Sequence, residues 1–404
     1  TSSMYRDHLA ALDRALTDAL ERAGQAGLKL DAVLFHAGSE RTYHRDDELI
    51  AFHPAAHFRR YVPPLAGPGH AVLARPGAKP KVVLVQPRDF WYDVTPPPDS
   101  YWQAEVELVT VERLGDAGEA LGGLDHTAYV GPDGDGAEAL GISADRIEPD
   151  ALMAPLDWHR AVKTPLEVAH LRRAAALAAA GHATAREAFE DGASEREIHW
   201  RYLEGADHME HELPYPSIVA LDDKAAILHY QHKRPDGAST GNVLLIDAGA
   251  QDGGYAADIT RTWTRAGADP LFVALNEGMD AAERELVAMV APGVPYVDIH
   301  VAAHRHVAAL LTETGILKGD PDELFALGVT RPFLPHGVGH HLGLQVHDVG
   351  GRQAGPDGGT VPPPEEHPFL RNTRVIEPGH VVTIEPGLYF VPMLLDPIRE
   401  GEHK

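Results

Sequence analysis

Two aspartates lie on either side of a predicted tight turn, in the stretch IDAGAQDGGYAADITRT. The aliphatic run before the turn and the β-branched pattern after it predict two strands. Asp252-Gly253 between them is a preferred dipeptide for a type I′ turn. With these two residues as the loop, Asp247 is expected to face Asp258 directly across an antiparallel pair.

Carboxylates that face each other in this way have Cβ atoms about 5 Å apart and repel each other. One or two divalent cations between Asp247 and Asp258 would make such a pair stable. A solvated hairpin whose acids never meet is the alternative interpretation. The hairpin alone does not decide between the two.

The composition restricts the chemistry further. The chain has 404 residues, with 35 Lys plus Arg against 60 Asp plus Glu, which gives a formal net charge of −25. This balance argues against binding to a nucleic acid backbone, which depends on Lys and Arg. Cysteine is absent, so a metal must be held by oxygen and imidazole, which suits Mn²⁺, Co²⁺, Mg²⁺ or Zn²⁺.

The sequence contains no apolar run that approaches the ~18 residues of a membrane span. Its first residues, TSSMYRDHLAALDRAL, lack the charged and apolar regions of a secretory signal. A cytoplasmic protein that does not insert into the membrane is therefore expected.

The fold class is expected to be α/β (α+β) with two domains, residues 1–157 and 158–404. Apolar runs at 31–35, 71–73, 81–86, 106–111 and 127–130 predict strands in the first domain. In the second, Thr164 and Glu167 are expected to form a capping box at the start of a long helix. Further helices are expected at 194–208, 270–290 and 297–315, and strands at 381–384 and 388–394.

Two features of the first domain are unusual in polarity. By default, the Asp46-Asp47 pair is interpreted as a solvated turn, and Phe90-Trp91-Tyr92 as part of the core.

Four segments of the second domain place ionisable groups in apolar or glycine-rich surroundings. They are 228–230 (LHY), the hairpin itself, 334–348 (LPHGVGHHLGLQVHD) and 383–387 (TIEPG). Each alone has a structural explanation, such as a buried histidine or a glutamate at a turn. Together, two Asp, one His and one Glu are an oxygen-rich set that suits a pair of ions sharing carboxylates.

In these motifs the sequence resembles the pita-bread metallopeptidases, the family of methionine aminopeptidase, aminopeptidase P, prolidase and creatinase. The resemblance rests on IDAGA–YAADITRT, PHGVGHHLGLQVHD and TIEPGLYF, in that order, within 150–404. The segments FHPAAHFRRYVPP, QPRDFWYDV and HPFLRNTR look like the bacterial Xaa-Pro dipeptidases (prolidases), which include the organophosphorus acid anhydrolases. The resemblance implies a creatinase-like N-terminal domain that contributes to dimerisation and covers the active site, a pita-bread catalytic domain and a homodimer.

The resemblance also implies roles for individual residues. Asp247 is expected to bind one ion and Asp258 to bridge both, with His340 and Glu385 as further ligands and Glu385 also as a proton shuttle. The histidines expected to bind substrate and stabilise the tetrahedral intermediate are His229, His336 and His347. Arg371 matches an arginine that receives the C-terminal carboxylate of the dipeptide.

Other matching positions line the substrate pocket. They are Tyr215, Leu228, Tyr296, Val346 and Leu370. Trp91 and Asp46-Asp47 resemble N-terminal residues that approach the active site in this family, partly from the second subunit. His341 has no assigned role and is expected to be structural.

One departure from the family pattern concerns the metal ligands. The family has a fifth ligand, a bridging glutamate in a late Gly-Gly-Ile-Arg-Ile-Glu-type strand, and no such segment precedes Lys404. Glu400 and Glu402 lack the flanking pattern. Either the sequence is shorter than the gene product, or the second ion binds poorly and the protein is weakly active or inactive.

The resemblance thus implies hydrolysis of Xaa-Pro dipeptides by a metal-bridging water, with two divalent ions. Mn²⁺ is the first candidate, and Co²⁺ and Zn²⁺ are the others. An Xaa-Pro aminopeptidase (aminopeptidase P) is one alternative, and a catalytically impaired binding protein is another. Hydrolysis of organophosphorus esters is a side activity that the resemblance allows.

Overall fold

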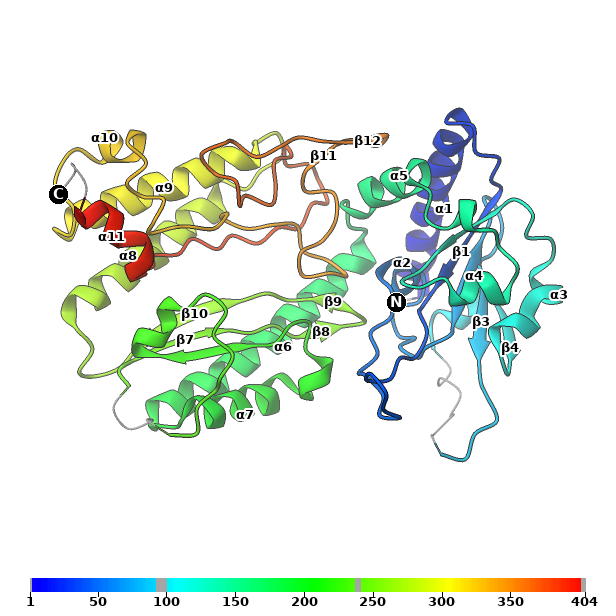
Figure 1. The fold of residues 1–404 in the computed structure, drawn as a ribbon, viewed down its shortest axis with the longest axis horizontal. Helices are drawn as coiled ribbons and strands as arrows, with labels where there is room; N and C mark the ends of the chain where they lie inside the picture. The colour runs from blue at the N-terminus through cyan, green and yellow to red at the C-terminus, as the bar shows by residue number, and fades with distance from the viewer. Residues whose placement is uncertain (1, 92–99, 237–240, 401–404) are drawn as a thin grey trace. The chain divides into compact units, whose positions relative to one another are not determined.

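The computed structural model describes residues 2–91, 100–236 and 241–400. The chain forms two units: residues Thr1–His170 with Ala354–Gly359, and residues Leu171–Gln353 with Thr360–Lys404. Figure 1 shows both units, with residues 1–170 of the first in blue to green, its segment 354–359 in orange, and the second in green to red. Among the described residues, no helix has the length and apolar character needed to span a membrane.

The first unit is built around a mixed five-stranded sheet of order β4-β3-β2-β1-β5. Its strands are β1 (Ala32–His36), β2 (Ala71–Ala74), β3 (Lys81–Val85), β4 (Glu107–Val111) and β5 (Thr127–Val130). β2 is antiparallel to both neighbours, whereas β1–β5 and β3–β4 are parallel. All five predicted strands are confirmed.

Helices cover both faces of this sheet. They are α1 (Ser2–Gln25), α2 (Ala56–Tyr61), α3 (Gly118–Leu121), α4 (Asp135–Ala139) and α5 (Asp150–Arg160). Alternate residues of β1 serve the two cores, because successive side chains of a strand point to opposite faces. Val33 and Phe35 join the core that includes α1, and Leu34 joins the core that includes α3 and α4.

The aromatic segment of the first unit does not contribute to its core. Phe90 is 85% exposed and Trp91 is 78% exposed, and their rings lie 4.7 Å apart. The core interpretation was therefore wrong for these two residues, while Tyr92 lies outside the described residues. Asp46 and Asp47 are exposed, and Asp46 Oδ1 accepts the Asp47 N–H at 2.8 Å, as expected of a solvated turn.

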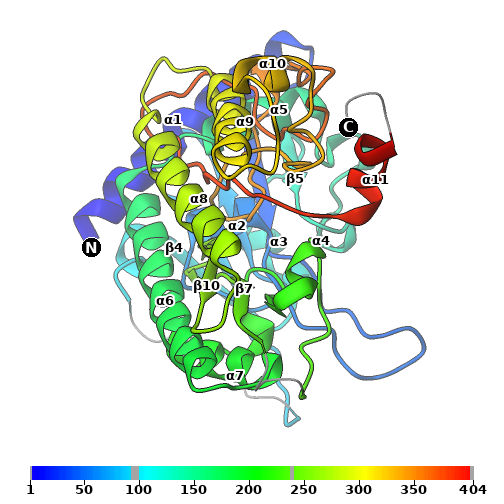
Figure 2. The same ribbon diagram turned by 90° about the vertical axis from the view of Figure 1, so that its left-hand side faces the viewer.

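In the second unit, three antiparallel strands form a sheet of order β10-β7-β6. They are β6 (Ile218–Leu221), β7 (Val243–Asp247) and β10 (Thr260–Thr264). Side chains of α6 (Pro165–Glu190) and α7 (Glu195–Ala206) share one core with this sheet. The remaining helices are α8 (Pro270–Ala288), α9 (Tyr296–Glu313), α10 (Pro321–Ala326) and α11 (Pro392–Glu400), and Figure 2 shows α8 and α9 side by side.

The hairpin that contains the aspartates has a different register from the one expected. Asp252 of β8 (Gln251–Asp252) pairs with Tyr255 of β9 (Tyr255–Ala256). Gly253-Gly254 therefore form the turn, at φ 58° and 86°, and two successive positive φ values favour glycine. Asp247 consequently pairs with Thr260 and not with Asp258.

The shift preserves the face on which the acids lie. Asp258 precedes Thr260 by two residues, and side chains alternate with a period of two along a strand. Asp247 and Asp258 are therefore diagonal neighbours, and directly facing residues were a wrong expectation.

The strands expected on either side of Glu385 are also corrected. Among the described residues, an isolated bridge joins Val382 to His341. No strand forms at 388–394, and α11 begins within its last three residues, at Pro392. A short hairpin, β11 (Gln353–Gly355) with β12 (Gly358–Thr360), interrupts the expected loop at 350–368.

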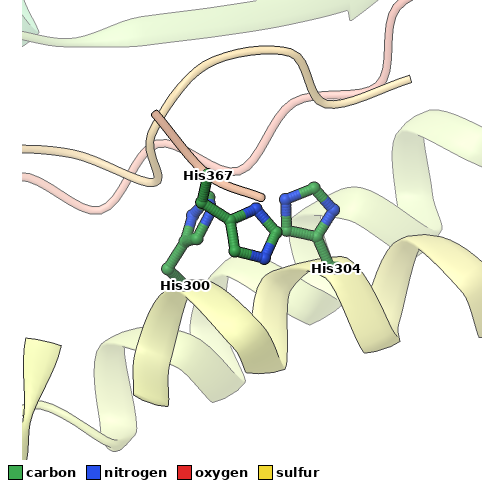
Figure 3. Close-up of side chains that lie close together, drawn as sticks. All are labelled: His300, His304 and His367. Atoms are coloured by element: carbon green, nitrogen blue, oxygen red, sulfur yellow. The ribbon is translucent and has the colours of Figure 1, made fainter. Parts of the chain in front are cut away.

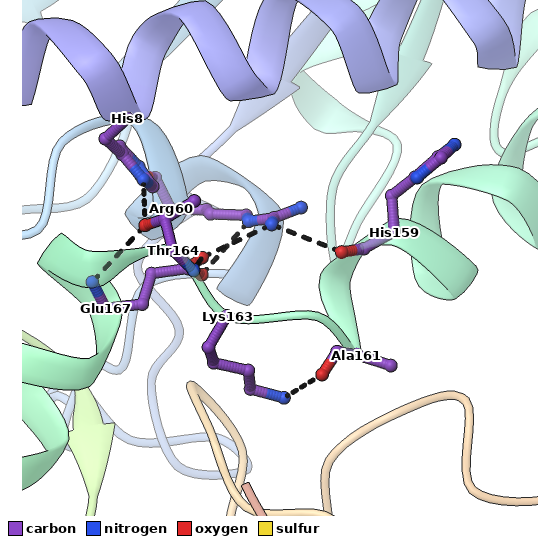
Figure 4. Close-up of polar contacts among 7 residues, drawn as sticks. All are labelled: His8, Arg60, His159, Ala161, Lys163, Thr164 and Glu167. Carbon is purple, nitrogen blue, oxygen red and sulfur yellow. Dashed lines mark hydrogen bonds and ion pairs between the residues drawn. The ribbon is translucent and has the colours of Figure 1, made fainter. Parts of the chain in front are cut away.

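A buried ion pair holds the start of α6 within the first unit (Figure 4). Arg60 Nε lies 3.1 Å from Glu167 Oε1, and the two residues are 7% and 1% exposed. Glu167 also accepts the Thr164 N–H at 2.8 Å, and Thr164 Oγ1 accepts the Glu167 N–H, which confirms the predicted capping box. His8 contacts the Arg60 carbonyl at 2.8 Å. Breaking the pair would therefore remove the Arg60 charge from a buried carboxylate.

Arg60→Met is expected to lower the free energy of unfolding by about 3–5 kcal/mol, because an uncompensated buried charge is costly. Urea unfolding at neutral pH measures this. The exposed Arg113–Asp116 pair provides the control, since Arg113→Met should leave the unfolding midpoint almost unchanged. Adding Glu167→Leu to Arg60→Met should restore most of the stability. Equal decreases in unfolding free energy for Arg60→Met and Arg113→Met would contradict a stabilising role of the buried pair.

The same pair predicts a pH dependence. Burial alone would raise the pKa of Glu167, but Arg60, His8 and the Thr164 N–H outweigh it and the pKa is lowered. A lowered folded-state pKa stabilises the protein above the ordinary glutamate pKa, and this contribution is lost as the pH falls through the folded value.

Candidate metal centre

His340 and Glu385 lie on two segments that run antiparallel. The His340 N–H donates to Thr383 Oγ1 at 3.0 Å, the Thr383 N–H donates to the His340 carbonyl at 2.9 Å, and the Glu385 N–H donates to the Val338 carbonyl at 2.7 Å. Gly339 has φ +148°, and a Cβ there would lie 2.4 Å from the Thr383 carbonyl oxygen. The glycine therefore permits the close approach that holds His340 Nε2 3.0 Å from Glu385 Oε1.

The two aspartates reach the same place from the hairpin. Asp258 Oδ2 lies 3.2 Å from His340 Nε2. The Tyr215 hydroxyl lies 2.7 Å from Asp247 Oδ1 and 2.9 Å from Asp258 Oδ1. The structure thus brings Asp247, Asp258, His340 and Glu385 together.

The cluster is dominated by negative charge. Burial, Asp258 and Glu385 raise the pKa of Asp247 to about 7, although the Tyr215 hydrogen bond opposes them. Burial would lower the pKa of His340, but Asp258 and Glu385 outweigh it and raise the pKa to about 10. Within the described part of the chain, no Lys or Arg forms an ion pair with these carboxylates.

The donor atoms fit a divalent cation. Asp258, His340 and Glu385 each offer one ligand atom, and these atoms lie within 4.8 Å of one another. His340 Nε2 and Glu385 Oε1 are buried, and neither makes an aligned hydrogen bond within the described residues. Carboxylate oxygens with one imidazole nitrogen suit Mn²⁺, Co²⁺ or Zn²⁺.

Comparison with protein families agrees with this geometry. The model of metallopeptidase family M24 matches residues 169–402. The chain belongs to metallopeptidase family M24. A second model, described as the N-terminal domain of Xaa-Pro dipeptidase, matches residues 3–158.

Curated relatives and a solved structure resemble this chain over nearly its whole length. An Xaa-Pro dipeptidase of Proteus mirabilis is 41% identical and covers 100% of this chain and 90% of its own length. One from Shewanella amazonensis is 41% identical over 98% of this chain and 88% of its own. Aminopeptidase P of Escherichia coli has the same fold, with a TM-score of 0.73 at 24% identity, covering 97% of this chain and 88% of that one.

The name M24 centre denotes the cluster of Asp247, Asp258, His340 and Glu385. Two of the three histidines predicted to act in catalysis lie beside it. His347 is exposed, and its ring lies 4.5 Å from that of His340. His336 Nε2 lies 3.0 Å from the Tyr389 hydroxyl. Its ring adds to the larger effect of His340 in lowering the pKa of Glu385 against burial. His229 is exposed, and no hydrogen bond among the described residues joins it to the cluster.

The predicted pocket positions differ in accessibility. Tyr296 and Leu370 are 0% exposed, and the Tyr296 hydroxyl donates to the Thr383 carbonyl at 2.7 Å. Leu228 and Val346 are half-buried. The roles of all four in substrate binding remain predictions.

Arg371 is exposed, and its charge contributes to lowering the pKa of His347. Its role in binding the carboxylate of the substrate remains a prediction. His341 is fully buried, with its ring 4.7 Å from that of His380, as expected of a structural residue.

The predicted site residues of the first unit are described within that unit alone. Asp46, Asp47 and Trp91 are exposed, and their approach to the active site remains a prediction. Glu400 ends α11, and Glu402 lies outside the described residues.

Sequence reasoning missed the position of Tyr215 between the aspartates. It was assigned to the pocket, and no local pattern predicts a hydroxyl that contacts both acids. It also missed three histidines outside the centre, His300, His304 and His367. The spacing of His300 and His304, one helical turn apart, was a usable signal for them.

Proposed function

We propose that this chain is a metal-dependent Xaa-Pro dipeptidase, which hydrolyses the peptide bond before a C-terminal proline. The observation that supports it most is the convergence of Asp258, His340 and Glu385, with Asp247 linked through the Tyr215 hydroxyl. The relatives named Xaa-Pro dipeptidase, at 41% identity over nearly the whole chain, support the substrate class.

Asp247, Asp258, His340 and Glu385 would hold two divalent ions in this proposal. When bound, such ions polarise the scissile carbonyl and lower the pKa of water. Because the set has three carboxylates and one imidazole, we propose Mn²⁺ as the native metal, with Co²⁺ and Zn²⁺ as competitors.

The side chains around the centre supply the remaining chemistry. Because the pKa of Glu385 is lowered by His340 despite burial, its carboxylate is ionised at neutral pH. It can accept a proton from the attacking water and return it to the proline nitrogen as that nitrogen leaves. In this proposal His336 and His347 would donate hydrogen bonds to the substrate carbonyl as negative charge develops on it.

Hydrolysis of Ala-Pro by protein treated with a chelator and then supplied with Mn²⁺ tests the proposal. Activity should be lost on chelation and recovered with the metal, and Ala-Ala should be cleaved far more slowly. The proposal fails if chelation leaves Ala-Pro hydrolysis unchanged. It also fails if none of Mn²⁺, Co²⁺ and Zn²⁺ produces hydrolysis.

Tyr215→Phe is expected to weaken metal binding by about 10–100-fold, the usual effect of removing a hydrogen bond that orients metal ligands. The hydroxyl lies within 3 Å of both aspartates, so its loss frees both carboxylates to rotate. Competition with a chromophoric chelator measures the affinity. Tyr43→Phe, a change at an exposed tyrosine of the first unit, should have no effect, and equal affinities for all three proteins would contradict the role of Tyr215.

The homodimeric state remains a prediction of the family resemblance, and the cytoplasmic location remains a prediction from the sequence. Sedimentation equilibrium of the purified chain would measure the first.

A further inference from the structure

Three histidines outside the M24 centre converge on one point. His300 and His304 lie one turn apart on α9, and His367 reaches them from the segment before Leu370 (Figure 3). Their ring centroids lie 4.4–4.7 Å apart. Each offers a nitrogen, and these nitrogens lie within 4.8 Å of one another.

The cluster is buried but not internally satisfied. His300 and His304 are 1% exposed and His367 is 8% exposed. Within the described structure, the Nε2 atoms of His300 and His304 are buried and have no hydrogen-bond partner. Buried polar atoms normally have such a partner, and one without it needs an explanation.

The rings are available as neutral ligands. Burial, together with the neighbouring histidines, lowers the pKa of His300 and of His304 to about 3, and that of His367 is lowered as well. A metal therefore need not displace a proton from a charged imidazolium at neutral pH.

The hydrogen bonds of His304 and His300 differ in how well they suit metal coordination. His304 Nδ1 lies 3.0 Å from Thr330 Oγ1, a contact that fixes the ring and leaves Nε2 for a ligand bond, as is usual for metal-binding histidines. His300 Nδ1 accepts the Val338 N–H at 3.2 Å. Coordination through His300 Nε2 gives up this one contact, so His300 is the weakest of the three ligands.

The three histidines also border a pocket of about 300 Å³. Its other lining residues include Arg331, His336 and Leu370, so the pocket adjoins the predicted catalytic site. The space leaves room for an ion and for water as its fourth ligand. Tetrahedral coordination by three imidazoles and one water is a common zinc arrangement.

We propose that His300, His304 and His367 form a second metal site, which shares no ligand with the M24 centre and binds Zn²⁺. Imidazole-only coordination selects Zn²⁺, Ni²⁺, Cu²⁺ or Co²⁺ over Mn²⁺ and Mg²⁺. The ion would join α9 to the segment that continues into Leu370 and Arg371. This inference does not depend on the proposed dipeptidase activity.

Zinc stoichiometry of the full chain tests the proposal. The protein is stripped with a chelator, titrated with Zn²⁺ and analysed for bound metal. The chain with His304→Gln and His367→Asn together should bind one equivalent less than the unaltered chain. His306→Gln is the matched control, because His306 lies on the same helix and pairs with Glu285 at 3.6 Å, and it should keep the full stoichiometry. Equal stoichiometry in all three proteins would overturn the proposal.

A second measurement tests the site even if the double variant misfolds. Zn-edge X-ray absorption of His340→Ala, in which the M24 centre is impaired and the cluster is intact, should show three imidazole nitrogens around the bound zinc. The single variant His367→Asn in that background should lose this signature while its circular dichroism stays unchanged. A zinc shell of water and carboxylate oxygen in His340→Ala would overturn the proposal.

Discussion

His340→Ala is expected to lower kcat/KM for Ala-Pro by about 10³-fold or more and to weaken metal binding. His340 Nε2 lies within 3.2 Å of both Asp258 and Glu385. Its loss therefore removes the imidazole ligand from the ion that these carboxylates are proposed to bind. A decrease of 10³-fold corresponds to about 4 kcal/mol of transition-state stabilisation, which matches the several kcal/mol attributed to metal polarisation of a carbonyl. Steady-state kinetics and metal analysis of the same preparation measure both effects.

His347→Ala separates loss of metal from loss of a catalytic side chain. The His347 ring lies 4.5 Å from the His340 ring in an edge-to-face arrangement. His347 is predicted to contact substrate and not metal. We expect full metal content with kcat lowered by about 10²–10³-fold, the usual effect of removing one donor to a developing oxyanion. Full metal content and activity in His340→Ala would show that the centre is not where we place it.

Arg371→Met is expected to raise KM for Ala-Pro by about 10–100-fold. The family resemblance assigns Arg371 to the substrate carboxylate, and its positive charge adds to burial and to His340 in lowering the pKa of His347. A hydrogen bond to a charged group contributes about 1.5–3 kcal/mol, and about 1.4 kcal/mol corresponds to tenfold in affinity. Steady-state kinetics with Ala-Pro measure the change in KM.

The amide Ala-Pro-NH₂ serves as the matched substrate, because it lacks the carboxylate that Arg371 is predicted to bind. The variant and the unaltered chain should cleave it equally slowly. Arg371→Lys should have an intermediate effect, since lysine keeps the charge but not the two-pronged geometry of guanidinium. An equal loss on the dipeptide and on the amide would contradict the assignment.

The elements of the fold were largely predictable because their signals are local. Apolar runs gave the five strands of the first unit, and the Thr164–Glu167 capping box gave the start of α6. The hairpin shows the limit of such signals. Asp252-Gly253 and Gly253-Gly254 both suit a type I′ turn, and only pairing across the sheet decides between them.

The centre was predictable for a different reason. A shift of two residues keeps both aspartates on the same face, so the wrong register still placed them together. The segment around Glu385 could not be predicted from periodicity, because it is held by contacts with 338–342 and not by a regular strand. His367 is joined to His300 and His304 only by tertiary packing.

The most direct test of the account is a length series of substrates with the Mn²⁺-loaded chain. The kcat/KM values for Ala-Pro, Ala-Pro-NH₂ and Ala-Pro-Ala are to be measured side by side. We predict that Ala-Pro is cleaved at least about tenfold more efficiently than either of the others, because only its free proline carboxylate can pair with Arg371. Efficient cleavage of Ala-Pro-Ala with Ala-Pro left intact would contradict a dipeptidase.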